Sequence, residues 1–220
     1  MFGKKKKIPC KFCGKNVHHL KQYNDSFCSE CERFQSEDLV KEIKLLPIFK
    51  LKTYNFAAQK YTYIVYNSLG SKIAFAEKRD VTKFVSDKNY NIRYYFFNDV
   101  NRVIGSIDGS SLVLDTTRDA TWKVYDYGRN LRAEIRHLAE SDTWEIIDAS
   151  GKIIAIRDVD ASQSLQKKMR EFTFVNSEDK EEIFFQAKRK AGFSLQLISE
   201  TVDPHIGWGF IIALHQRLYA

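Results

Sequence analysis

The chain has 220 residues, of which 44% are hydrophobic and 14% aromatic, so it can bury a substantial core in one ordinary domain with a small appendage. It holds only 10 glycines and 3 prolines, which argues against long disordered linkers, and no apolar run reaches the length of a transmembrane helix. The formal net charge is +7, and residues 1–35 carry +5 of it, because eight basic residues there face three acidic ones.

Residues 1–9 are predicted to be a basic tail. Lys4, Lys5, Lys6 and Lys7 stand together, but no apolar stretch follows them, so the tail does not have the pattern of a secretory signal. We therefore expect a cytoplasmic protein. The four lysines are candidates for contact with an anionic ligand.

Residues 10–35 are predicted to be a zinc ribbon. All four cysteines of the chain lie there, in the spacing C-x2-C-x14-C-x2-C: Cys10, Cys13, Cys28 and Cys31. Two CxxC turns can supply the four thiolates that a structural zinc ion binds tetrahedrally, and such a set leaves no open position for catalysis. Gly14 follows the first turn and can adopt the left-handed backbone that a zinc knuckle needs. We therefore expect one structural Zn²⁺ ion.

Two other arrangements use the same segment. The four thiols could form two disulfides, although a chain without an export signal favours the metal. His18 or His19 could replace one cysteine, although four thiols already complete the set. The ribbon has few apolar residues, so metal binding must supply its folding free energy, about 10–16 kcal/mol in peptides of this kind.

Residues 36–47 are predicted to form a short connecting helix. Ser36 can cap its N-terminus and Pro47 ends it. Four apolar residues share one helical face, on which the segment can pack against the next domain: Leu39, Val40, Ile43 and Leu46.

From residue 48 the hydrophobic period is two, and one pattern recurs. An aromatic residue is followed four positions later by Asn or Asp, and seven further on by Ala or Gly. The copies are Tyr63/Asn67/Ala74, Tyr94/Asn98/Gly105, Trp122/Asp126/Ala133 and Trp144/Asp148/Ala155, with a weaker start at Phe172/Asn176.

Each copy predicts a β-hairpin whose aromatic residue faces inward. The Asn or Asp begins the turn, and a nearby glycine, Gly70, Gly128 or Gly151, takes the positive φ angle. The small residue in the return strand leaves room for a bulky neighbour. Extended over the segment, the pattern predicts about twelve strands between residues 48 and 199.

Residues 204–219 are predicted to be a helix, with Asp203 as its N-cap and Pro204 at its first position. The middle of this helix has no polar face, so it must be buried in protein or in lipid. Its length of roughly 24 Å is short of a bilayer core of about 30 Å, which favours burial in protein. A helix about 10 Å wide does not fit inside an eight-stranded barrel, but about twelve strands leave room for it.

The predicted fold class is therefore mainly β, a closed barrel of about twelve strands around a C-terminal apolar helix. Residues 48–220, roughly four-fifths of the chain, resemble the tubby-like fold, and most closely its LURP-one-related and phospholipid-scramblase-like branch. Two W-x-[VI]-x-D hairpins, at Trp122 and Trp144, and the apolar segment after Asp203 carry this resemblance. Both tryptophans are expected to be core residues of the scaffold.

Tubby proteins bind phosphoinositides through clustered Lys and Arg, but those positions do not map residue by residue onto this chain. The nearest candidates in the barrel include Lys188, Arg189 and Lys190, for which solvated residues of a strand edge are the favoured interpretation. The scramblase-like calcium loop is not matched, because Met169 stands where the loop needs Glu.

No catalytic motif is present, so we expect a protein that is not an enzyme. The first hypothesis is a binding or adaptor module that docks on an anionic lipid or membrane surface, peripheral to the membrane. The alternative is binding of a nucleic acid or a protein through the basic zinc ribbon. A purely structural adaptor role is the third possibility.

Overall fold

The computed structural model describes residues 8–36, 53–59, 62–81, 83–84, 92–109, 115–158, 170–189 and 192–218. Three predictions therefore lie outside the described residues: the contacts of Lys4 to Lys7, those of Lys190, and the connecting helix over 36–47 apart from Ser36.

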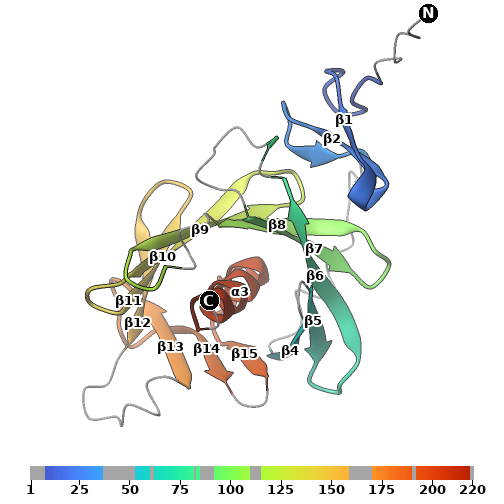
Figure 1. Cartoon of the computed structure of the whole chain (residues 1–220). Coiled ribbons are helices and arrows are strands. Elements are labelled where there is room, and N and C mark those ends of the chain that lie inside the picture. The colour runs from blue at the N-terminus through green and yellow to red at the C-terminus, as the bar shows by residue number, and fades with distance from the viewer. Residues whose placement is uncertain are drawn as a thin grey trace, which may run out of the picture.

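Twelve antiparallel strands close into one barrel, which confirms the predicted fold class (Figure 1). Each strand pairs with its neighbours in the chain, and β15 pairs with β4 to close the ring. The strands are β4 (Thr53–Gln59), β5 (Thr62–Asn67), β6 (Lys72–Asp80), β7 (Ile92–Asn98), β8 (Val103–Gly109), β9 (Ala120–Asp126), β10 (Leu131–Leu138), β11 (Thr143–Asp148), β12 (Ile153–Asp158), β13 (Glu171–Asn176), β14 (Ile183–Arg189) and β15 (Phe193–Leu197).

The repeated Asn or Asp starts each hairpin turn through its own side chain. Asn67 Oδ1 accepts hydrogen bonds from the backbone N–H groups of Leu69 (3.0 Å) and Ser71 (2.9 Å). Asp148 Oδ1 does the same for Ser150 (2.8 Å) and Lys152 (3.0 Å). The sequence pattern therefore corresponds to one turn geometry used repeatedly.

The residue three positions after the Asn or Asp takes the positive φ angle in four of these turns: Gly70 (80°), Asn101 (62°), Arg129 (65°) and Gly151 (89°). The prediction was right for Gly70 and Gly151 but wrong for Gly128. Gly128 lies one position too early, and Arg129 adopts the left-handed conformation instead. The turn geometry fixes the position, whichever residue occupies it.

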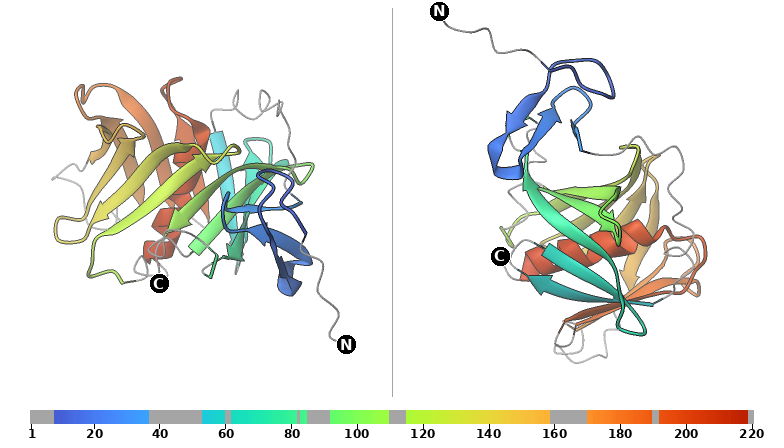
Figure 2. Two further views of the ribbon diagram at one scale, coloured as in Figure 1. Left: turned by 90° about the horizontal axis from the view of Figure 1, so that it is seen from above. Right: turned by 90° about the vertical axis from the view of Figure 1, so that its right-hand side faces the viewer.

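The predicted C-terminal helix, α3 (Pro204–Leu218), runs through the barrel (Figures 1 and 2). Of its 15 residues, 13 are buried. Asp203 caps it as predicted, because its Oδ1 accepts the backbone N–H of His205 at 2.9 Å. Among the described residues, no helix is long and apolar enough to cross a membrane.

Two glycines let α3 approach the barrel wall closely. A Cβ atom at Gly207 would lie 2.7 Å from Leu195 Cδ2, and one at Gly209 would lie 2.8 Å from Val124 Cγ2. The inner wall is aromatic: Trp122 stacks on Trp144 with ring centroids 5.7 Å apart, and Phe210 of α3 packs edge-on against Trp144. Both tryptophans are thus core residues, as expected.

The N-terminal segment forms a separate small sheet on the outside of the barrel (Figure 2). Its strands are β1 (His18–Leu20), β2 (Asp25–Cys28) and β3 (Arg33–Phe34), with a short 3₁₀ turn, η1 (Lys21–Tyr23), after β1. We call residues 8–36 the ribbon. It has a buried core in common with the outer face of the barrel, formed by Phe27 and Phe34 together with Val81, Tyr95 and Phe97.

This shared core explains an irregularity in the burial of the strands. β9 alternates between buried and partly exposed residues, as a strand with one face on the core should. In β7, by contrast, all five residues from Arg93 to Phe97 are buried, because the ribbon covers the outer face. The run of four aromatic residues at 94–97 is the sequence signal of this second interface.

Candidate metal centre

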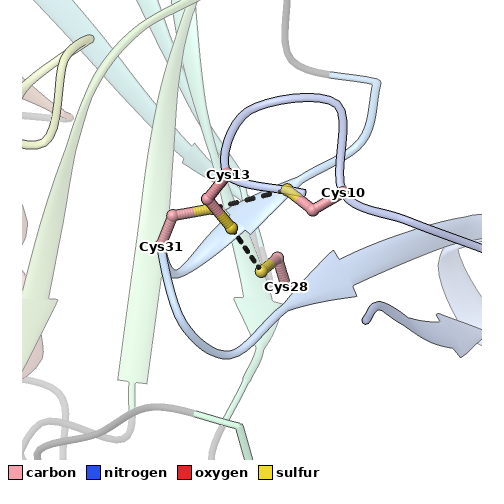
Figure 3. Close-up of side chains that lie close together, drawn as sticks. All are labelled: Cys10, Cys13, Cys28 and Cys31. Atoms are coloured by element: carbon pink, nitrogen blue, oxygen red, sulfur yellow. Dashed lines mark hydrogen bonds between the residues drawn. The ribbon is translucent and has the colours of Figure 1, made fainter. Parts of the chain in front are cut away.

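The four cysteines meet at one point of the ribbon (Figure 3). Their sulfur atoms all lie within 4.8 Å of one another. The Sγ atoms of Cys10 and Cys31 are 3.6 Å apart, and those of Cys13 and Cys28 are 3.5 Å apart. Residues from both ends of the ribbon are thus brought together at this centre.

The first CxxC turn is held by its own backbone. The N–H of Cys10 donates to the carbonyl of Lys15 (2.6 Å), and the N–H of Gly14 donates to the carbonyl of Cys10 (2.9 Å). Gly14 has a φ angle of 73°, as predicted for the residue after the second cysteine. This closed loop directs the side chains of Cys10 and Cys13 toward the same side.

The second CxxC turn is likewise followed by a residue with a positive φ angle, but this residue is not a glycine. Cys28 ends β2, and Cys31 is followed by Glu32, which has a φ angle of 53°. A side chain in this left-handed region costs about 1–3 kcal/mol, so other contacts must hold it there. Glu32 is therefore a residue to which the sequence analysis gave no role and the structure does.

Nitrogen donors surround the Cys10 sulfur. The backbone N–H of Phe12 (3.4 Å) and the side-chain amide of Gln35 (3.3 Å) both point at it. Burial opposes ionisation of this thiol, but the donors at Cys13, Phe12 and Gln35 outweigh it and lower the pKa of Cys10 to about 6. Burial and the neighbouring thiols raise the pKa of Cys31 well above its usual range. Four thiolates close together repel one another, and a bound cation would remove that repulsion.

The donor set fits a tetrahedral metal ion. The shortest S···S separations of 3.5–3.6 Å are far from the roughly 2.05 Å of a disulfide, and all four cysteines are free thiols. They are close to the spacing of about 3.8 Å expected for four sulfurs each about 2.3 Å from one zinc ion. The disulfide alternative is therefore not what the structure shows.

Neither histidine of the ribbon belongs to the cluster. The ring of His18 lies 4.9 Å from that of Phe84, and Nδ1 of His19 lies 3.4 Å from Ser26 Oγ. Both residues are exposed, and both belong to strand β1. The ligand set is thus made of sulfur alone.

An ion-pair network joins the second CxxC turn to the barrel. Arg93 Nη1 and Nη2 donate to the backbone carbonyl (3.0 Å) and the carboxylate (2.8 Å) of Glu32. The same guanidinium donates twice to Asp108, at 2.7 Å each. Arg129 donates to both Glu32 (3.1 Å) and Asp108 (3.1 Å). Two arginines and two carboxylates therefore balance their charges at the interface.

Arg79 makes a second contact between the ribbon and the barrel. Its guanidinium lies over four aromatic rings, closest to Phe34 at 4.6 Å, and 3.9 Å from Asp25 of β2. The backbone N–H of Asp80 donates to the hydroxyl of Tyr23. The ribbon is thus fixed to the barrel at several points along β6 and β7.

Two of the basic residues proposed for an anionic ligand, Lys188 and Arg189, lie within the described residues. Lys188 forms an ion pair with Glu171 of the neighbouring strand β13 at 3.7 Å, which is the arrangement of a solvated strand surface. Arg189 is partly buried at the end of β14. The binding of an anionic ligand by these residues stays a prediction.

The comparisons with known proteins give a likeness of shape only. No protein-family model matches the chain, and no curated protein matches it. A solved X-ray structure of the Arabidopsis thaliana protein AT5G01750 is similar to it with a TM-score of 0.48 and 11% identity, over 76% of this chain and 88% of that one.

Proposed function

We propose that this protein is a non-enzymatic binding module whose ribbon holds one structural zinc ion on Cys10, Cys13, Cys28 and Cys31. The observation that carries this proposal is the set of four free thiols within 4.8 Å of one another. Sulfur-only tetrahedral sites select zinc or iron–sulfur clusters, and the CxxC pairs of a small ribbon are typical of zinc. A metal with four protein ligands has no position for a substrate.

The metal would stabilise the second CxxC turn as well as the ribbon. Cys31 as a ligand would hold the backbone of Glu32 in its left-handed conformation. In this conformation the backbone carbonyl and the carboxylate of Glu32 both accept hydrogen bonds from Arg93. The zinc would therefore stabilise the contact between ribbon and barrel, because its ligand Cys31 directly precedes Glu32. The twelve strands around their own helix support a further proposal, that the barrel is a tubby-like fold of the LURP-one-related or scramblase-like branch.

We further propose that the module docks on an anionic membrane surface, as a cytoplasmic protein peripheral to the membrane. The ribbon has four basic and three acidic residues, so its charge falls from +1 to −1 when four thiolates bind one Zn²⁺ ion. The positive charge of the N-terminal region then rests on Lys4 to Lys7. Each of these lysines contributes about 1 kcal/mol near acidic lipid. The four together give about 4 kcal/mol, which corresponds to roughly millimolar affinity, so stable docking needs a further contact.

Co-sedimentation with vesicles tests this role. The full chain is mixed with vesicles of phosphatidylcholine alone or with 30% phosphatidylserine, and compared with a variant carrying alanine at positions 4 to 7. We expect binding to acidic vesicles only, lost in the variant and weakened by 300 mM salt. Lys188→Ala is the matched control, because Lys188 is paired with Glu171. This variant should bind the vesicles as the native chain does. Equal binding by all three proteins, or none, would reject the proposal.

A second candidate is binding of a nucleic acid or protein through the ribbon, favoured by one feature. Lys11 and Arg33 lie 5.0 and 4.9 Å from the ring of Phe12, beside the first CxxC turn. An aromatic ring between two cations suits a base and its phosphates. A mobility shift at about 50 mM salt that is lost in Phe12→Ala would favour this candidate over the membrane.

A further inference from the structure

A cavity of about 230 Å³ lies far along the chain from the metal centre, beside the first turn of α3. Its lining is almost entirely apolar: Ile146, Ile154, Phe184, Thr201, Val202 and Ile206. This volume is below the roughly 300–1,000 Å³ of pockets that enclose a whole small molecule. It suits one bulky apolar side chain used as an anchor.

The walls of the cavity are fixed by the fold. Ile146, Ile154 and Phe184 stand near the ends of β11, β12 and β14 that carry the hairpin turns. The loop over residues 198–203 is tied to β14, because the N–H groups of Ile198 and Ser199 both donate to the carbonyl of Phe184, at 2.9 and 3.1 Å. A partner therefore meets a preformed cavity, which lowers the entropic cost of binding.

The segments that flank the lining residues in the sequence are acidic, although the chain as a whole has a net charge of +7, and of their carboxylates Asp203 is paired with Arg132. Three segments adjoin the lining residues: 148–152, 176–182 and 198–203. Together they hold two lysines and seven carboxylates, a net charge of −5: Lys152, Lys180, Asp148, Glu178, Asp179, Glu181, Glu182, Glu200 and Asp203. Several of these acidic residues are exposed, among them Asp179, Glu181 and Glu200.

The combination of an apolar cavity and acidic surroundings decides between possible occupants. An anionic lipid could place its chain in the cavity, but its headgroup would meet like charge. A basic segment would gain from both features, since its anchor is buried while its cations face the carboxylates.

We propose that this cavity docks a basic peptide segment of a partner protein, which inserts one Phe, Leu or Met side chain between Ile146 and Ile206. Lysines or arginines on either side of the anchor face the acidic segments. Thr201 is exposed and lines the cavity, so we place the entrance for the anchor there. This surface is separate from the metal centre and from Lys4 to Lys7, so it does not depend on the proposed membrane docking.

Fluorescence anisotropy with a labelled peptide, Gly-Lys-Lys-Phe-Lys-Lys-Gly, tests the proposal on the full chain. We expect saturable binding that weakens at least tenfold when Phe becomes Ala or when the four lysines become glutamates. In the protein, Thr201→Arg should weaken binding at least tenfold, because it places a cation at the entrance. Ser68→Arg makes a similar change at an exposed turn on another hairpin and should stay within twofold of the native chain.

Two other results would overturn the proposal. One is the absence of saturable binding up to 1 mM peptide, or an equal loss in Thr201→Arg and Ser68→Arg. The other is binding of octanoate that is as tight as that of the peptide and is also lost in Thr201→Arg, which would make the cavity a lipid site. Circular dichroism of both variants shows whether they are folded, so that a loss of binding is read as a loss of the site.

Discussion

Arg93 binds Glu32 twice, through the carboxylate at 2.8 Å and through the backbone carbonyl at 3.0 Å. Arg93 is 0% exposed and belongs to the barrel, whereas Glu32 belongs to the ribbon and directly follows a proposed zinc ligand. A buried guanidinium needs such partners, because an unpaired buried charge is strongly unfavourable. The metal centre and the barrel are therefore energetically connected through one residue.

Replacing the carboxylate of Glu32 should weaken this connection. In Glu32→Gln, Arg93 keeps its bonds to Asp108 and to the backbone carbonyl of residue 32 but loses its second charged partner. We expect the free energy of unfolding to fall by about 1–3 kcal/mol. Urea denaturation measures it as a lower midpoint. Glu30→Gln, two residues away and exposed, is the control and should change the midpoint little. Equal midpoints for the two variants would contradict the role given to Glu32.

The N-cap of α3 should make stability depend on pH. Burial would raise the pKa of Asp203, but hydrogen bonds from His205 and the nearby Arg132 outweigh it, so the pKa is lowered. A carboxylate with a lowered pKa stabilises the fold above its unfolded value and loses that contribution as the pH falls through its folded value, here below about pH 4.

Asp203→Asn keeps a capping oxygen and removes the charge. It should be less stable than the native chain at pH 7, and its stability should change less between pH 5 and pH 2. Thermal unfolding across this range by circular dichroism is the measurement. Parallel pH profiles for the two proteins would show that the charge of Asp203 does not stabilise the helix entry.

The close contact at Gly209 predicts an effect opposite to helix propensity. Ala should favour the helix by about 1 kcal/mol over Gly. However, a Cβ at position 209 would lie 2.8 to 3.3 Å from Val124, Ile107 and Ile135, and such overpacking costs about 1–3 kcal/mol. We therefore expect Gly209→Ala to lower the unfolding midpoint. A more stable variant would mean that the barrel wall moves easily.

The turn glycine Gly151 offers a contrasting test. Its φ angle is 89°, and a Cβ there would meet no atom within 4 Å, so any cost of Gly151→Ala comes from the backbone alone. We expect the free energy of unfolding, measured by urea denaturation, to fall by about 1–2 kcal/mol in this variant. Gly128→Ala tests the corrected turn assignment, because Gly128 is not in the left-handed region and any cost must come from the contacts of the new Cβ with Asn130 Nδ2 (2.9 Å) and Asp126 Oδ1 (3.2 Å).

Much of the barrel could be predicted because its information is local. The Asn or Asp at each turn, the inward aromatic residue and the small residue opposite it recur along the chain, and the apolar segment after Asp203 needs an enclosing wall. The cluster of four cysteines could also be predicted from the sequence, because a metal site needs defined residue types at defined spacings.

The contact between ribbon and barrel could not be predicted in the same way. Arg93 and Glu32 are 61 residues apart, and each alone looks like an ordinary surface charge in the sequence. Arg129 takes the positive φ angle where Gly128 was expected, because turn geometry and not residue preference decides the position. The apolar cavity could not be predicted either, because its lining comes from three strands, one loop and the helix.

Metal analysis of the purified full chain tests the central claim, that the four cysteines bind a structural zinc ion. Native mass spectrometry should find one zinc ion per chain, lost in Cys28→Ser. Chelation should then increase hydrogen exchange in the ribbon and on β7, where Arg93 and Tyr95 are covered. A chain that contains no zinc, has four reactive thiols and shows the same exchange with and without chelator would contradict the account.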